Sequence, residues 1–176
     1  MKRFWIFVMI AGIAVLAMSA FQFMTRPSSG DPAPSFALQT IDGSTMTLDD
    51  FRGRPLIIHF WATWCGVCVH EFPALMRLAR DLAPEGLAVA AVSEEGKPGD
   101  KAVREFFRGE KPPFPVLIDG DGSVADAYRS WGVPETVMVD RNGFIVWRRA
   151  GAIDWDDHDV RAYIRASMGG DRPTVE

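Results

Sequence analysis

Cysteine and histidine are scarce in this 176-residue chain, which has two cysteines and three histidines. A zinc site normally takes four ligands, and the sequence has neither a second cysteine pair nor two histidines at the spacing of a zinc-binding helix. A disulfide between Cys65 and Cys68 would close a very short loop, which constrains the unfolded chain little and therefore stabilises the fold little. A pair of thiols that forms and breaks a small disulfide is the preferred interpretation, with a metal site and a structural disulfide as the alternatives.

Charged residues are absent from Phe4 to Met24, a run of predominantly apolar side chains. A helix of this length crosses the hydrocarbon core of a membrane. Lys2 and Arg3 precede the run and an acidic sequence follows it, which predicts a cytoplasmic N-terminus and an exported body. A cleaved signal peptide, processed near residues 17–19, is the alternative. We prefer an uncleaved anchor because apolar residues continue to Met24, and we assign residues 1–24 to a transmembrane anchor or signal segment.

Basic residues are the minority in the rest of the chain. Three of the 19 basic residues precede residue 27, which leaves 16 against 23 acidic residues and a net charge of −7. A body with this charge is not expected to bind nucleic acid through its overall field. Residues 25–34 hold three prolines and a Ser-Ser-Gly stretch, the composition of a linker. The globular domain is expected at residues 35–168, followed by a flexible tail at 169–176.

Short apolar runs alternate with amphipathic stretches along residues 35–168. Asp42-Gly43, between the first two runs, is a strong hairpin signal, and the run that ends at Trp61 is apolar enough for a central strand covered on both faces. The pattern predicts an α/β domain whose sheet gains antiparallel members from two hairpins. The expected strands are 36–39, 44–48, 55–61, 87–93, 114–118, 135–139 and 144–149, and the expected helices are 68–82, 101–108, 123–131 and 155–168.

The two cysteines lie where the strand at 55–61 gives way to the helix that follows it. A cysteine at a helix N-terminus has its thiolate stabilised by unpaired backbone N–H groups and by the helix dipole. This position predicts that Cys65 is the nucleophile. Cys68, one turn further along, would then resolve the mixed disulfide, so the two form a redox-active pair.

The segment from Trp64 to Cys68, preceded by Phe60-Trp61-Ala62, resembles the active site of thioredoxin-fold proteins. Glu71 and Pro73 extend the likeness to the Cys-x-x-Cys-x-x-Glu-x-Pro signature of the membrane-anchored TlpA/ResA-like family. The stretch Gly-Val-Pro-Glu-Thr at 132–136 resembles the cis-proline loop of the cytochrome c maturation thioredoxins (CcmG/DsbE-like). The resemblance implies a thioredoxin fold, a central mixed β-sheet flanked by helices, with an extra N-terminal β-hairpin and one preceding transmembrane helix.

The resemblance also implies roles for four further residues. Pro134 is expected to be cis and to lie against the disulfide, where Val133 would offer its backbone to a client strand beside Trp64. A simple turn proline is the alternative. In the ResA-like branch the glutamate that matches Glu71 adjusts the proton affinity of the thiols, by repulsion or by relaying the proton of Cys68. A solvated helix glutamate is the alternative.

His59 departs from the family pattern, because thioredoxin itself carries a buried aspartate there and relatives in this branch often carry asparagine. The imidazole either shuttles the proton of Cys68, as a modulator of its pKa, or is a core histidine hydrogen-bonded to the backbone. Glu94 and Glu95 end a predicted strand and are candidates for a pocket role, whereas His70 and His158 are expected on the surface.

The resemblance implies a thiol–disulfide oxidoreductase of the bacterial inner membrane, single-pass, with its catalytic domain on the periplasmic side. It would reduce disulfides in client proteins, which include apocytochrome c, whose haem-binding cysteines must be reduced in an oxidising compartment. A membrane thiol-reductant donor would recharge it, and no cofactor or metal is expected beyond the redox-active disulfide. The alternatives are a Cu(I)-binding chaperone, since thiolates suit Cu(I), and a general reductase that serves copper-site proteins.

Overall fold

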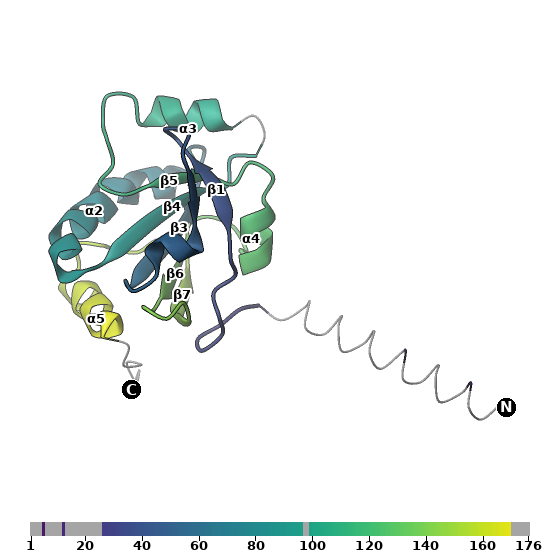
Figure 1. Ribbon diagram of the computed structural model, residues 1–176. Helices are drawn as coiled ribbons and strands as arrows, with labels where there is room; N and C mark the ends of the chain where they lie inside the picture. The colour runs from purple at the N-terminus through teal and green to yellow at the C-terminus, as the bar shows by residue number, and fades with distance from the viewer. Residues whose placement is uncertain (1–4, 6–11, 13–25, 97–98, 170–176) are drawn as a thin grey trace.

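The computed structural model of the chain describes Trp5, Gly12, residues 26–96 and residues 99–169 (Figure 1). The expected membrane anchor, residues 1–24, lies outside the described residues apart from Trp5 and Gly12, and the expected tail lies outside them after Gly169. Within the described ranges no helix is both long enough and apolar enough to span a membrane. The anchor and the tail therefore stay predictions.

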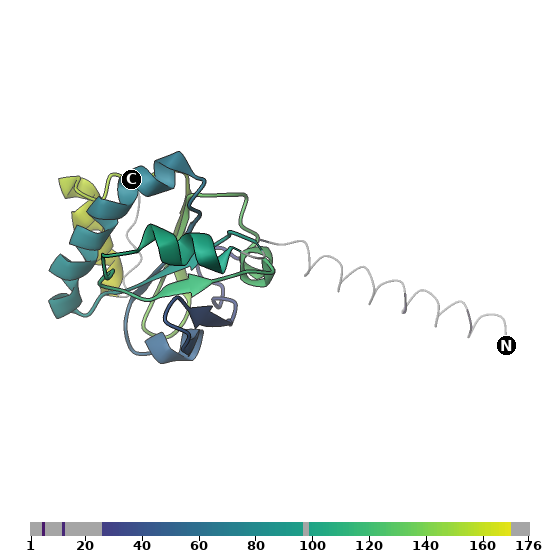
Figure 2. The same ribbon diagram turned by 90° about the horizontal axis from the view of Figure 1, so that it is seen from above.

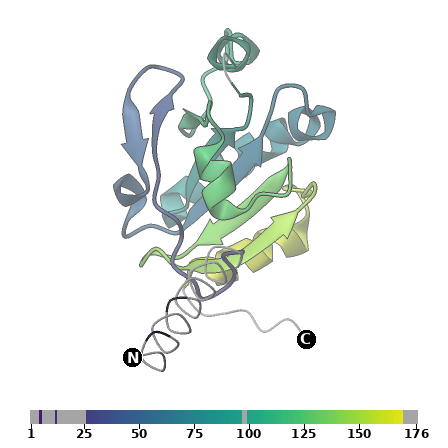
Figure 3. The same ribbon diagram turned by 90° about the vertical axis from the view of Figure 1, so that its right-hand side faces the viewer.

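A seven-stranded mixed sheet forms the centre of the domain, with the strand order β2-β1-β5-β4-β3-β6-β7. Strands β3, β4 and β5 run parallel to one another, whereas the other strands pair in antiparallel fashion. The predicted mixed α/β sheet is confirmed, and the hairpin of β1 and β2 stands at one edge of it (Figure 3). The strands are β1 Ala37–Thr40, β2 Thr45–Thr47, β3 Leu56–Trp61, β4 Ala88–Ser93, β5 Val116–Ile118, β6 Glu135–Val139 and β7 Ile145–Ala150.

Helices cover both faces of the sheet. One apolar cluster joins α2, α3 and α5 to Ile57 and Trp61 of β3, and a second joins α4, η1 and the hairpin to Ile58 and Phe60. Figure 2 shows α2 and α5 side by side. Alternate side chains of a strand point to opposite faces, so His59 lies on the α2 face with Ile57 and Trp61. The helices are η1 Leu48–Phe51, α2 Gly66–Leu82, η2 Ala83–Glu85, α3 Asp100–Phe106, α4 Ser123–Tyr128 and α5 His158–Met168.

The last helix begins three residues later than the sequence pattern predicts. The side chain of Asp157 accepts hydrogen bonds from the backbone N–H groups of Asp159 and Val160, so Asp157 is the N-cap of α5. Trp155, which the pattern placed inside the helix, instead lies before it and is fully buried. This shift brings its indole N–H to the active site.

The predicted linker at 25–34 differs from the structure, because its described part is held against the domain. The Gly30 N–H donates to the Ile145 carbonyl oxygen over 2.8 Å, and the Ile145 N–H donates back to Asp31 over 2.9 Å. The Ala33 N–H donates to the Gly143 carbonyl oxygen over 2.9 Å. Proline and serine content predicts a free segment, but these residues pair with the start of β7. Residues 30–33 are therefore part of the packed domain.

Candidate active site

The two cysteines form a disulfide at the start of α2, with their Cα atoms 5.3 Å apart. Cys65 is the N-cap of the helix, and the backbone N–H of Cys68 donates to the Cys65 sulfur over 3.2 Å. That donor and the helix dipole would stabilise a thiolate on Cys65. Cys65 is 9% exposed and Cys68 is 0% exposed. The geometry therefore favours Cys65 as the sulfur that meets a client and Cys68 as the resolving thiol.

Exposed apolar side chains flank the disulfide. Trp64 is 67% exposed and Val67 is 54% exposed, on either side of Cys65. Large apolar side chains at a surface commonly mark a place where a partner binds. The contact of Trp64 with a client stays a prediction, and the exposure of its indole is compatible with it.

The loop that precedes β6 lies next to the cysteines. The Val133–Pro134 peptide bond is cis, as the resemblance implies. β6 pairs with β3 in a register that sets Glu135 opposite Phe60, so residues 132–134 lie beside the segment that leads to Cys65. Val133 packs against the apolar cluster that contains both cysteines. The backbone of Val133 makes no hydrogen bond to any described residue, so it is available to a client strand.

Glu71 is buried one turn after Cys68, which excludes the alternative of a solvated helix glutamate. Its Oε2 atom accepts hydrogen bonds from the Ile153 N–H over 2.9 Å and from the Trp155 Nε1–H over 3.1 Å. Its Oε1 atom faces His59 Nε2 across 3.5 Å. Neither of these two facing atoms has a hydrogen-bond partner among the described residues. The hydrogen bonds to Oε2 thus fix the carboxyl, and Oε1 is left to bind or release a proton.

His59 is a core histidine, but its partner is a side chain rather than the backbone. Its Nδ1 atom lies 3.1 Å from Thr136 Oγ1 on β6, and its ring makes edge contacts with Phe72 and Trp155. Burial lowers the pKa of His59 to about 3. Burial also raises the pKa of Glu71, against the two hydrogen bonds from Ile153 and Trp155 that lower it. Both shifts favour neutral forms, so the pair presents a neutral imidazole to a carboxyl that retains its proton more strongly than usual.

A surface cavity of about 460 Å³ borders Glu71. It lies between the start of α2 and residues 152–156, and both Val67 and Glu71 line it. Glu71 is therefore a buried carboxyl-bearing residue at the edge of a surface cavity, whereas Cys68 does not line that cavity.

The burial of His59 predicts a pH-dependent difference in stability between the wild type and His59→Asn. Below its ordinary value of 6.5 the unfolded chain takes up a proton on His59, whereas the folded chain does so only near pH 3. The unfolded state is therefore favoured as pH falls through this window, by about 1.4 kcal/mol per pH unit from this one group. The raised pKa of Glu71 acts in the opposite direction, but the variant retains that contribution.

Urea unfolding at pH 7, 6, 5 and 4 checks this expectation. The stability of the wild type relative to His59→Asn should be constant above pH 7 and should decline steadily below pH 6. A difference that stays constant across the whole range would mean that His59 takes up its proton equally in both states.

Two glutamates that follow β4 bind the two segments of the site, the turn before Cys65 and the loop before β6. The Glu95 carboxylate accepts a hydrogen bond from the Thr63 N–H, just before Trp64. Glu94 accepts one from the Ser130 hydroxyl over 2.8 Å, and that hydroxyl in turn accepts one from the Gly132 N–H over 3.3 Å. Burial raises the pKa of Glu94. Their position at a strand end predicts a pocket role. In the structure they instead accept hydrogen bonds from Thr63 and Ser130, which lie far away in the sequence.

A Cu(I) ion at this site would have few ligands. Among residues 26–96 and 99–169, no group of three or more histidine, cysteine, aspartate or glutamate side chains is placed to hold a metal ion. A bound Cu(I) ion would therefore have the two thiolates of the reduced pair without a cluster of such side chains around them. Competition with a Cu(I) chelator tests that alternative.

Known proteins share both the sequence and the fold of this site. Residues 29–148 match the AhpC/TSA family. The thioredoxin-like protein YneN of Bacillus subtilis is 36% identical over 116 residues, which cover 66% of this chain and 68% of YneN. The thiol-disulfide oxidoreductase ResA of the same organism is 33% identical over 120 residues, which cover 68% of this chain and 65% of ResA.

A solved structure extends the comparison to nearly the whole domain. The putative thiol:disulfide interchange protein DsbE of Chlorobium tepidum has a TM-score of 0.72 and 30% sequence identity, and the match covers 80% of this chain and 98% of that one. A disulfide at the N-terminus of α2, a cis-proline loop beside it and relatives named for thiol–disulfide exchange point to one chemistry. The chain belongs to the AhpC/TSA family and is a thiol–disulfide oxidoreductase of the ResA/DsbE type with a thioredoxin fold.

Proposed function

We propose that the chain is an exported, membrane-anchored reductase that delivers electrons from Cys65 and Cys68 to disulfides of client proteins. The observation that carries this proposal is the asymmetry of the pair. Cys65 caps a helix and retains 9% exposure, whereas Cys68 is 0% exposed and lies one turn before a carboxyl with a raised pKa. One sulfur is thus suited to attack a client and the other to complete the exchange internally.

The exchange has two steps that balance in atoms and electrons. The Cys65 thiolate attacks one sulfur of the client disulfide, which breaks the client S–S bond, forms a mixed disulfide and releases the first client thiolate to be protonated. Cys68 then loses its proton to Glu71, the buried carboxyl that follows it by one turn on α2, and attacks the Cys65 sulfur. The second client thiol leaves, and the protein holds the Cys65–Cys68 disulfide. Two electrons have passed to the client, and a membrane thiol donor must return them.

We further propose that the clients include apocytochrome c. The haem-binding cysteines of that protein must be thiols before haem attaches, and an exported compartment oxidises thiols. The apolar run before residue 25, which predicts the anchor, would hold the domain at the membrane where the donor lies.

Labelling of intact bacteria with a membrane-impermeant maleimide tests the direction of electron flow and the location together. The protein should be recovered in the membrane fraction with Cys65 already modified, because a reductase is kept reduced and its domain faces outward. Cys65 and Cys68 are the only cysteines, so the double serine variant is the matched control for labelling. Modification only after cell lysis would contradict export. Cysteines that stay unmodified until a reductant is added would contradict a reducing role.

A further inference from the structure

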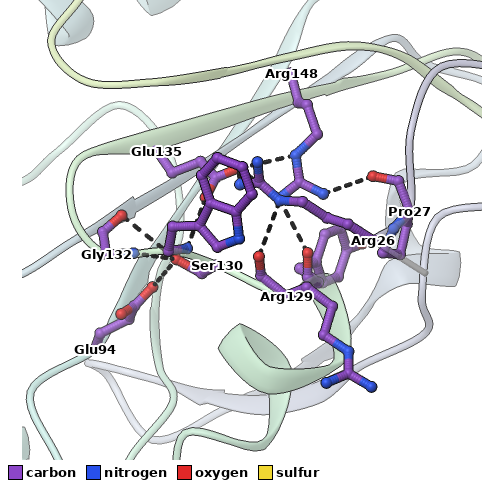
Figure 4. Close-up of polar contacts among 10 residues, drawn as sticks. Arg26, Pro27, Glu94, Arg129, Ser130, Gly132, Glu135 and Arg148 are labelled. Carbon is purple, nitrogen blue, oxygen red and sulfur yellow. Dashed lines mark hydrogen bonds and ion pairs between the residues drawn. The ribbon is translucent and has the colours of Figure 1, made fainter. Parts of the chain in front are cut away.

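Arg26, in the segment before β1, reaches the loop that carries Pro134 (Figure 4). Its Nε–H donates to the Arg129 carbonyl oxygen over 3.0 Å, and its Nη2 forms an ion pair with Glu135. The guanidinium lies over the Trp131 ring, 3.9 Å from the centroid. One side chain therefore contacts a residue before the loop, a residue within it and a residue after it.

Glu135 is the fixed centre of these contacts, because its side chain is completely buried. Its Oε1 atom accepts hydrogen bonds from Arg26 and also from Arg148 Nε over 2.8 Å. Its Oε2 atom accepts one from the Trp131 N–H over 3.2 Å, so the carboxylate spans the loop from one end to the other. A buried carboxylate needs opposite charge and full hydrogen bonding. Arg148, on β7, supplies the opposite charge and a hydrogen bond to the Glu135 carboxylate. Arg26 is therefore a second cation on a carboxylate that is already paired.

Arg148 also joins the N-terminal segment to the same place. It donates to the Pro27 carbonyl oxygen over 2.6 Å (Figure 4). It also donates to the Tyr128 carbonyl oxygen over 3.0 Å. Together the two arginines bind both carbonyl groups at the C-terminal end of α4, where cations are favoured. The N-terminal segment is thereby fixed to α4 and to the start of the loop.

Trp131 links Arg26 to client binding, because Arg26 contacts its exposed indole. Its side chain is 79% exposed, yet one face of its indole is covered by the guanidinium. An exposed indole without such a contact samples several rotamers, and ordering it when a partner binds costs free energy. Trp131 directly precedes Gly132 and Val133, whose backbone lies beside Cys65. An indole held in place by Arg26 is prepared for an apolar side chain of a client strand paired with Val133.

We propose that Arg26 is a positioning residue for client binding, which holds Trp131 and the loop Trp131–Pro134 in the conformation that an extended client segment meets. This role rests on the proposed reduction of client proteins. It makes the segment that leads in from the N-terminus a part of the client-binding surface. Arg26 does not touch the sulfur atoms, so it acts on recognition and leaves the reactivity of Cys65 unchanged.

The test compares a protein disulfide with a small one, using the full chain in detergent. Steady-state reduction of insulin, with dithiothreitol as the electron source, gives KM and kcat for a polypeptide. Single-turnover reaction of the pre-reduced chain with 5,5′-dithiobis(2-nitrobenzoate) reports the reactivity of Cys65 alone. Arg26→Ala should raise the KM for insulin about fivefold, in the range of one cation–π contact, with kcat and the small-disulfide rate within about twofold of wild type. The KM of Arg26→Lys for insulin should lie between those of the wild type and Arg26→Ala, because lysine retains the charge but lacks the planar guanidinium.

A double-mutant cycle separates positioning from a general loss of structure. Trp131→Ala changes an exposed side chain and should raise the KM for insulin by a similar factor, and Arg26→Ala should add nothing further in that background. Arg165→Ala removes an arginine that pairs with Glu85 beyond the far end of α2, and it should leave both activities unchanged.

Three results would overturn the role of Arg26: an unchanged KM for insulin in Arg26→Ala, independent effects of the two substitutions, or equal slowing of the protein and small disulfides. A wild-type chain that reduces neither disulfide would instead contradict the proposed function. The two failures are therefore distinct.

Discussion

Replacing Cys65 with serine is expected to reduce client disulfide reduction at least about a thousandfold, to the rate measured without the protein. The attacking sulfur is lost, and the buried Cys68 has no route to a client. Cys68→Ser should differ in kind. Its Cys65 thiolate still attacks, but no second thiol resolves the product, so the mixed disulfide with the client accumulates.

Non-reducing electrophoresis of cells that express each variant measures this difference. Cys68→Ser should yield high-mass adducts that a reductant dissolves, and Cys65→Ser and the double serine variant should yield none. Adducts in equal amounts from Cys65→Ser would mean that Cys68 also attacks clients, and adducts from Cys65→Ser alone would mean that the two sulfurs have their roles reversed. Mass spectrometry of the adducts then identifies the client class: cytochrome c precursors would support the narrow proposal, and copper-site proteins would support the general reductase.

The cysteine site could be predicted from the sequence because its parts are adjacent in the chain. The strand, the turn and the first turn of α2 occupy residues 56–68, so local pattern is enough to place Cys65 at a helix N-terminus. The loop at 132–136 needed the family resemblance, since nothing in the spacing brings residue 134 to residue 65. The register of β3 with β6 does that in the structure.

The contacts among buried polar groups could not be predicted, because each joins elements that the sequence separates widely. His59 and Glu71 belong to β3 and α2, and whether they meet depends on how that helix lies on the sheet. Trp155 was expected inside a helix, but the Asp157 cap starts that helix at His158, which leaves Trp155 before it and able to donate to Glu71. Arg26 and Glu135 are 109 residues apart, and composition alone placed Arg26 in a linker.

Replacing Glu71 with glutamine should slow the second step of the exchange and leave the first step unchanged. Glutamine has the same shape, and its carbonyl oxygen can still accept from the Ile153 and Trp155 N–H groups, so the fold should be retained. It cannot take up the proton that Cys68 must lose. Loss of a positioned base typically costs at least about a hundredfold, so resolution of the mixed disulfide should slow by that order.

Quenched-flow reaction of the pre-reduced chain with a fluorescent disulfide peptide measures both steps. The mixed disulfide should accumulate in Glu71→Gln and stay at a low level in the wild type. The rate at which Cys65 attacks the peptide disulfide should be equal in the two proteins. Glu85→Gln is the matched control, because that glutamate lies just beyond the C-terminal end of α2 and pairs with Arg165.

The pH profile shows whether Glu71 acts as the base or only as a charge. A base must be ionised to accept a proton, and burial raises the pKa of Glu71, so resolution in the wild type should slow as pH falls through that raised value. The pH profile of Glu71→Gln should lack this decline. If Glu71 acted only by repelling the Cys68 thiolate, its removal would lower the pKa of that thiol and speed resolution at low pH. A faster variant below pH 7 would therefore reject proton transfer to Glu71 and identify electrostatic repulsion as its contribution.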